Sequence, residues 1–183
     1  MAETSEIIEI DITKLQPGDH IFTYLLEGVF THHGIYVGDE MVIHFIPGPT
    51  IGNEEFPKSG PCERCQGYNG GSGDGVIMTG KVVKSCLHCF GDKKFLYKYG
   101  VSWVEALKST CCPYQSKSLQ EGLETANEKL NTGFGVYDTV KNNSEHFATF
   151  CRAGKRYSVQ PLIDKFGDKL DAIENIDAGP DEN

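Results

Sequence analysis

The chain has 183 residues, of which 39% are hydrophobic, and it carries a net charge of −9 at pH 7. That much apolar material can fill the core of one compact domain. No apolar run reaches ~18 residues, so the sequence predicts no transmembrane helix, and the acidic N-terminus does not resemble a signal peptide. We therefore expect a soluble, cytoplasmic protein.

The negative charge is concentrated near the two ends of the chain. Residues 1–14 and 171–183 together contain nine acidic residues and one lysine. We interpret both segments as solvated ends. The remaining body is close to neutral and has no basic stripe interleaved with aromatic residues, so nucleic-acid binding has no support. A small basic cluster, Arg152, Lys155 and Arg156, is interpreted as solvated surface rather than as a site for phosphate head groups.

The first quarter of the chain alternates between apolar and polar side chains in the manner of β-strands. The clearest unit is a hairpin in which Gly34–Val37 and Met41–Phe45 flank a glycine-aspartate turn. Two adjacent histidines, His32 and His33, precede the hairpin and must point to opposite faces of a strand. Only one of the two can therefore face a site on a given side of the sheet. His20 is interpreted as structural.

Residues 47–80 are rich in glycine and proline and contain little core-forming material. Two Cys-x-x-Cys pairs lie in and just after this stretch, with twenty residues between them: Cys62, Cys65, Cys86 and Cys89. That spacing is at the edge of the range typical of zinc ribbons. Four thiolates close a tetrahedral Zn²⁺ site, so we expect a structural zinc that orders this segment. Two disulfides or unbonded thiols are the alternatives, and disulfides are disfavoured in a cytoplasmic chain.

The second half of the chain predicts further strands and helices. Residues 80–84 and 95–99 have the composition of strands. Residues 118–130 place apolar side chains three and four positions apart, as in an amphipathic helix. Trp103 is expected to be buried, and residues 157–175 predict a last helix.

A short helix is predicted after Asn143, because asparagine is a favoured N-cap and Gly154 suits a left-handed stop. Ser144 then lies in the first turn, at the positive end of the helix dipole, where a developing anion is stabilised. It is either part of the capping arrangement or a nucleophile, and the residue taken alone favours the cap. Cys151, two turns further on, is expected to pack in the core rather than to act as a nucleophile.

Four short motifs occur in a fixed order: Pro-Gly-Asp-His-Ile (17–21), His-x-Gly-Ile-Tyr-Val-Gly (32–38), Val-Ile-His-Phe (42–45) and Asn-x-Glu-His-Phe (143–147). Together they resemble the LRAT (lecithin:retinol acyltransferase-like) family, and most closely the plant NC-domain proteins. The resemblance implies an α+β, circularly permuted papain-like (NlpC-type) fold. In that fold a small antiparallel sheet packs on the helix that carries the nucleophile. Paired cysteines are also frequent in the plant relatives, which favours a structural zinc.

The resemblance implies roles for three residues. His32 matches the catalytic histidine of the family, His44 matches the second histidine that orients it, and Ser144 stands in the place of the nucleophilic cysteine. A serine hydroxyl is a far poorer nucleophile than a thiol. Three explanations stay open: a pseudoenzyme, a weak serine enzyme, or a deliberate Cys→Ser change. Backbone N–H groups at the helix start, including that of Ser144, are the candidate oxyanion donors.

The resemblance therefore predicts an LRAT-like thiol acyltransferase or phospholipase that acts on acyl lipids such as phospholipids, with peripheral membrane contact. The serine at position 144 would make it inactive or weak. The alternative is a catalytically silent domain that binds a lipid or a protein. The predicted organisation is an acidic N-terminal segment (1–12), an LRAT-like domain (13–157) with a zinc-pinned insertion at 47–95, and a C-terminal helix and acidic tail (158–183). The C-terminal end predicts no membrane anchor.

Overall fold

A computed structural model of the chain describes residues 9–25, 30–48, 80–108 and 110–159. These residues form a mixed α+β fold, as the motifs imply. The elements in chain order are η1 (Ile12–Lys14), β1 (His20–Leu25), β2 (Phe30–Gly38), β3 (Met41–Pro47), β4 (Gly80–Cys86), α1 (Leu87–Phe90), β5 (Phe95–Leu96), β6 (Lys98–Tyr99), α2 (Trp103–Lys108), β7 (Cys111–Cys112), α3 (Leu119–Thr132) and α4 (Ser144–Ala153).

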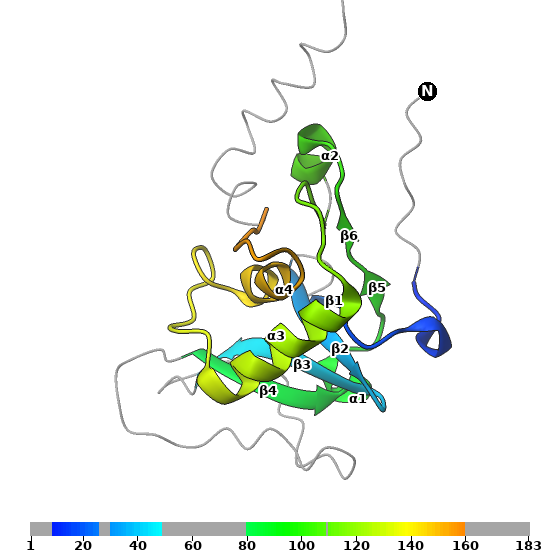
Figure 1. Cartoon of the computed structure of the whole chain (residues 1–183), viewed down its shortest axis with the longest axis vertical. Coiled ribbons are helices and arrows are strands. Elements are labelled where there is room, and N and C mark those ends of the chain that lie inside the picture. Colours follow the sequence, from blue (N-terminus) through cyan, green and yellow to red (C-terminus); the bar gives the residue numbers. More distant parts are fainter. Residues whose placement is uncertain (1–8, 26–29, 49–79, 109, 160–183) are drawn as a thin grey trace, which may run out of the picture.

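The main sheet has five strands in the order β4-β3-β2-β1-β5, and its neighbouring strands are antiparallel. The helices α3 and α4 lie on one face of this sheet, whereas α1 packs on the other (Figure 1). A separate pair, β6 and β7, runs parallel beside α2. The strand β4 comes from the second half of the predicted insertion and pairs along the whole of β3, so this part of the segment belongs to the sheet.

The β2–β3 hairpin forms where the sequence predicts it. Asp39 and Glu40 are its two turn residues, with φ angles of 52° and 57°. Two positive φ angles give the turn a twist that matches that of the flanking strands. The pair Gly38 and Met41 closes the hairpin, so the turn lies one residue later than predicted.

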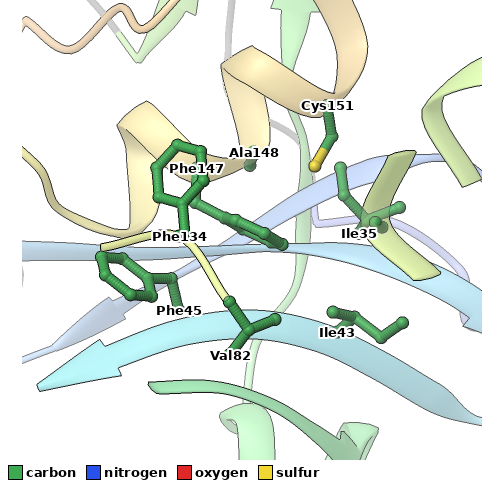
Figure 2. Packing of buried hydrophobic residues seen from close by; sticks show 9 residues of the cluster. Ile35, Ile43, Phe45, Val82, Phe134, Phe147, Ala148 and Cys151 are labelled. Atoms are coloured by element: carbon green, nitrogen blue, oxygen red, sulfur yellow. The ribbon is translucent and has the colours of Figure 1, made fainter. Parts of the chain in front are cut away.

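The largest buried cluster fills the space between the main sheet and the helices α3 and α4 (Figure 2). Its strand residues have odd numbers in both β2 and β3, because alternate side chains of a strand share a face. The cluster consists of Ile35, Ile43, Phe45, Val82, Ala126, Phe134, Phe147, Ala148 and Cys151. Burying this face against α4 fixes the helix over β2 and β3, and its N-terminus lies just beyond the end of their pairing.

Capping determines where the two long helices begin. The Ser118 hydroxyl accepts a hydrogen bond from the N–H of Glu121, so α3 begins at Leu119, and the predicted helix at 118–130 is confirmed. Asn143 caps α4, and Gly154 ends it with a φ of 68°. The predicted short helix is therefore confirmed at both ends.

Some expectations were wrong. Trp103 is 59% exposed rather than buried, because it begins α2 and, among the described residues, packs edge-on against two tyrosine rings, those of Tyr114 and Tyr157. The single strand predicted at 95–99 is divided, since the N–H of Tyr97 donates to the His20 carbonyl between β5 and β6, which pair with different strands.

Other predictions fall on parts of the chain that the structure does not describe. Most of the predicted last helix at 157–175 lies there, as do Cys62 and Cys65. Within the described residues, no helix is long and apolar enough to cross a membrane.

Candidate active site

The first turn of α4 is buried, so its backbone N–H groups need partners inside the protein. The Asn143 side-chain oxygen accepts hydrogen bonds from the N–H groups of Glu145 and His146, at 3.0 and 3.1 Å. These contacts fix position 144 at the positive end of the helix dipole.

The Ser144 side chain is 3% exposed and lies where β2 and β3 separate. The pairing of these two strands ends at Gly34 and His44. Just beyond that pair, the backbone N–H of His33 donates a hydrogen bond to Ser144 Oγ at 3.2 Å. The hydroxyl thus occupies the place that a β3 carbonyl would take if the ladder continued.

His32 and His44 lie on the face of the sheet that α1 covers. A hydrogen bond of 2.8 Å joins His32 Nε2 to His44 Nδ1, and both rings contact Phe90 of α1. On its other side, His44 Nε2 lies 2.8 Å from Ser85 Oγ of β4. These three side chains form one hydrogen-bonded row, hereafter the His32–His44–Ser85 chain.

Both histidines of this chain are neutral at pH 7. Burial lowers the pKa of His32 to about 4. Burial, and secondly the nearby His32, lower the pKa of His44 well below its ordinary value. A neutral imidazole can accept a proton, as a general base must. Among the described residues no group hydrogen-bonds to His32 Nδ1, so this nitrogen remains to accept one.

The structure does not join the Ser144 hydroxyl to the His32 ring. Both side chains are described, and no hydrogen bond links them. Their connection is the backbone, since the N–H that binds Ser144 belongs to the residue directly after His32. The side chain of His33 points to the opposite face, as the strand alternation predicts, where it stacks against Phe22.

A second histidine pair lies on the face of the sheet that carries α4. His33 Nδ1 is 3.0 Å from His20 Nε2, and His20 Nδ1 is 2.7 Å from the Tyr99 hydroxyl. His33 Nε2 is 2.8 Å from Thr31 Oγ1. Burial lowers the pKa of both rings well below the ordinary value, so they too are neutral at pH 7. Both ring nitrogens of His20 are occupied in this network, and its structural role stays a prediction.

Sequence reasoning missed a buried carboxylate beside position 144. Glu145 is 2% exposed and accepts hydrogen bonds from the hydroxyls of Tyr97 and Ser158. The only signal in the sequence was the place of Glu145 in the last motif. Nothing marked Tyr97, Ser158 or Ser85, because each comes from a segment distant in sequence from its partner.

Cys151 packs in the core between α4 and the sheet, as predicted. Burial raises the pKa of its thiol to about 12, so it is not a nucleophile at neutral pH.

The prediction of a solvated basic cluster is confirmed for Lys155 and Arg156, which are exposed, and is wrong for Arg152. Arg152 is 8% exposed, with its guanidinium carbon 5.7 Å from the centre of the Tyr99 ring. Room for this side chain exists because Gly122 of α3 lacks a Cβ, which would lie 2.7 Å from Arg152 Cδ. Arg156 packs over the ring of Phe134 at 4.0 Å.

Two of the four cysteines predicted to bind zinc are described. Cys86 is the last residue of β4, and Cys89 lies in α1. A strand end followed by a helical turn suits one half of a tetrahedral thiolate site. Phe90 of the same helix contacts the rings of His32 and His44. The position of α1 therefore affects the position of these two rings.

The chain is similar to proteins of one family. The model for the lecithin retinol acyltransferase family matches residues 13–157. Protein LEAD-SENSITIVE 1 of Arabidopsis thaliana is 36% identical over 161 residues, which cover 78% of this chain and 59% of that protein. Human lecithin retinol acyltransferase is 29% identical over 145 residues, with 78% and 56% covered. The rat enzyme is 32% identical over 144 residues, with 75% and 54% covered. The chain thus spans a little over half the length of these relatives.

Proposed function

Because this chain belongs to the lecithin retinol acyltransferase family, we propose that it carries an acyl-transfer site for acyl lipids such as phospholipids. In this proposal residue 144 is the nucleophile position, His32 is the general base and His44 orients it. The observation that supports it most is the His32–His44–Ser85 chain, in which His32 Nδ1 has no hydrogen-bond partner among the described residues. The backbone N–H of the next residue, His33, contacts Ser144 Oγ at the start of α4.

The proposed proton path has one consistent set of tautomers. If His32 Nδ1 accepts the proton of the nucleophile, then His32 Nε2–H donates to His44 Nδ1. His44 Nε2–H must then donate to Ser85 Oγ, which the distance of 2.8 Å allows. The row of donors thus stabilises the imidazolium that forms when His32 is protonated.

The proposed reaction is transfer of an acyl group through residue 144. Its side-chain atom attacks the ester carbonyl of the lipid while His32 takes its proton. The ester bond breaks, the departing alcohol receives the proton from His32, and the acyl group stays on residue 144. Water or a second alcohol then attacks this intermediate while His32 takes its proton. The bond between the acyl group and residue 144 breaks, and His32 returns the proton to the side chain of residue 144. The positive end of α4 favours the oxyanion that forms in both steps.

Serine makes this site weak. Its hydroxyl keeps its proton at neutral pH, and here it accepts a hydrogen bond from the His33 amide rather than donating to His32. The same contact favours a second candidate function, a catalytically silent domain that binds a lipid or protein. In that case Ser144 serves to pin α4 to β2.

The proposal is tested by intact mass spectrometry after incubation with a short-chain phosphatidylcholine. Three proteins are compared: the chain as written, Ser144→Cys, and Ser144→Cys with His32→Ala. We expect an acyl adduct on Ser144→Cys, little or none on the serine form, and none on the double variant. If the Ser144→Cys protein gains no adduct with several lipid donors, the silent binding domain becomes the better account.

A further inference from the structure

A closed series of contacts begins and ends at residue 144, on the face of the sheet that carries α4. Starting from Ser144, the backbone leads to Glu145, whose carboxylate accepts a hydrogen bond of 2.7 Å from the Tyr97 hydroxyl. The Tyr97 ring stacks on His20, with centroids 4.0 Å apart and an angle of 16° between the planes. His20 hydrogen-bonds to His33, and the His33 N–H returns to Ser144 Oγ.

The carboxylate of Glu145 also holds the segment that follows α4. The Ser158 hydroxyl donates a hydrogen bond to Glu145 Oε2. Ser158 Oγ in turn accepts a hydrogen bond of 3.4 Å from the side-chain amide of Asn143, the cap of α4. These donors hold the buried carboxylate in one position, because a hydrogen bond to a charged group is stronger than a hydrogen bond between two neutral groups.

We propose that Glu145, held by Tyr97 and Ser158, is a positioning residue that fixes residue 144 against the His33 amide at the opening between β2 and β3. The inference concerns the site of the proposed function and names further residues in it. The experiment that tests it measures hydrogen exchange of the His33 amide and does not require acyl transfer. Its result is therefore independent of whether the proposed function is correct.

Because burial raises the pKa of the Glu145 carboxyl, its protonation favours the buried arrangement, and the protection of the His33 amide should increase as the pH falls through about 6. Burial raises the pKa of this carboxyl to about 6, although the hydrogen bonds from Ser158 and Tyr97 oppose that rise. The other titratable groups that interact with it have pKa values raised by burial, far above neutral pH: Tyr97, Tyr99, Tyr157 and Cys112. The rings of His20, His33 and His146 have lowered pKa values, mainly because they are buried. Glu145 is thus the member of this group that changes charge near pH 6.

The test is hydrogen exchange of the His33 amide, followed by NMR between pH 5 and 8 after correction for intrinsic exchange. The variant Tyr97→Phe removes the bond to Glu145 and keeps the ring that stacks on His20. We expect it to lower the protection of the His33 amide by about tenfold, since a hydrogen bond to a charged group is lost. The amide of Ile35, two residues further along β2 and paired with β3, should keep its protection.

Two further variants separate positioning from general destabilisation. Tyr157→Phe is the matched control, because this buried hydroxyl bonds to the Ala106 carbonyl instead. Glu145→Gln keeps an acceptor for Tyr97 and a donor for Ser158 but cannot ionise. It should retain His33 protection and abolish the change in that protection near pH 6, and it also serves if Tyr97→Phe does not fold.

Two results would overturn the inference. One is an equal fall in protection at His33 and Ile35 in Tyr97→Phe, which would indicate only a weaker fold. The other is a pH dependence of His33 protection that persists unchanged in Glu145→Gln.

Discussion

A serine hydroxyl at position 144 has no tendency to ionise near neutral pH, so any reactivity there depends on the base next to it. The best candidate base is His32, whose Nε2 is occupied by His44 and whose Nδ1 has no described partner. The orientation of His32 depends on His44, and that of His44 depends on Ser85. Three residues from three neighbouring strands thus determine which nitrogen of His32 has no hydrogen-bond partner among the described residues.

Ser85 should matter for reactivity although it does not touch the nucleophile. In a Ser144→Cys background, Ser85→Ala leaves the Nε2–H of His44 without its buried acceptor. We expect the rate at which iodoacetamide alkylates the thiol at position 144 at pH 7 to fall roughly tenfold, because an unsatisfied buried donor costs about 1–3 kcal/mol. Ser85→Thr, which keeps the hydroxyl, is the control. Equal rates for Ser85→Ala and the parent would remove Ser85 from the proposed chain.

At the residue scale, the sequence predicted those features that depend on alternation within a strand. The opposite orientation of His32 and His33 and the capping of α4 by Asn143 are examples. The roles of His32, His44 and Ser144 stay predictions. The contacts of Ser85, Tyr97 and Ser158 could not be predicted, because strand register and the return of the chain after α4 bring their partners together.

At the element scale, the candidate site depends on how closely α1 approaches the β2–β3 hairpin. Gly34 lies between the two, and a Cβ on it would stand 2.6 Å from Val42 Cγ1 and 3.0 Å from Phe90 Cε2. It would also lie 3.1 Å from His44 Cβ. The glycine is therefore required by close packing against α1 and His44.

We expect Gly34→Ala to lower the free energy of unfolding by about 1–3 kcal/mol, the usual cost of overpacking a core. It should also displace His44, so the same change in Ser144→Cys should slow alkylation. Chemical denaturation measures the first effect. Gly133→Ala is the control, because a Cβ there meets no atom within 4 Å, although its φ of 81° carries a backbone cost of its own. A Gly34→Ala protein as stable as the parent would contradict the packing argument.

The sequence predicted the long elements of the fold better than the short ones. The hairpin, α3 and α4 have strong periodicity or caps, and they form as predicted. The two-residue strands β5, β6 and β7 have no such signal, since their pairing is set by tertiary contacts. The exposure of Trp103 was also missed, because it too depends on tertiary contacts.

At the scale of the whole molecule, buried histidines should dominate the pH dependence of stability. His32 and His146 have pKa values lowered to about 4 in the folded protein, mainly by burial. The unfolded chain therefore binds more protons between pH 6.5 and 4, so their stabilisation is complete above pH 6.5 and is lost as the pH falls through 4. Glu145 acts in the opposite sense, since its pKa is raised to about 6 and its protonation below that pH favours the folded state.

We expect the free energy of unfolding in urea to fall steadily from pH 7 to pH 4, because five buried histidines with lowered pKa values outweigh one glutamate. In Glu145→Gln the fall should be steeper, since the opposing contribution is gone. Stability that is constant or increases toward pH 4 would contradict these assignments.

A structural zinc is a further proposal at this scale, with Cys62, Cys65, Cys86 and Cys89 as its ligands. Elemental analysis of the purified protein should give about one zinc per chain, the stoichiometry of a four-thiolate site. Cys89→Ser should lower that content and the thermal stability, whereas Cys151→Ala should leave the zinc content unchanged. Full zinc content in Cys89→Ser would show that Cys89 is not a ligand, and a parent protein without zinc would point to thiols or disulfides instead.

The central claim is that His32 is the base for residue 144. The most direct test is the rate of iodoacetamide alkylation at pH 7 in Ser144→Cys, with and without His32→Ala, and with His88→Ala as a control on α1. We predict that His32→Ala slows alkylation of the thiol at position 144 by at least about tenfold, within the range usual for a general base, and that His88→Ala does not. Equal rates in all three proteins would show that His32 does not activate this position.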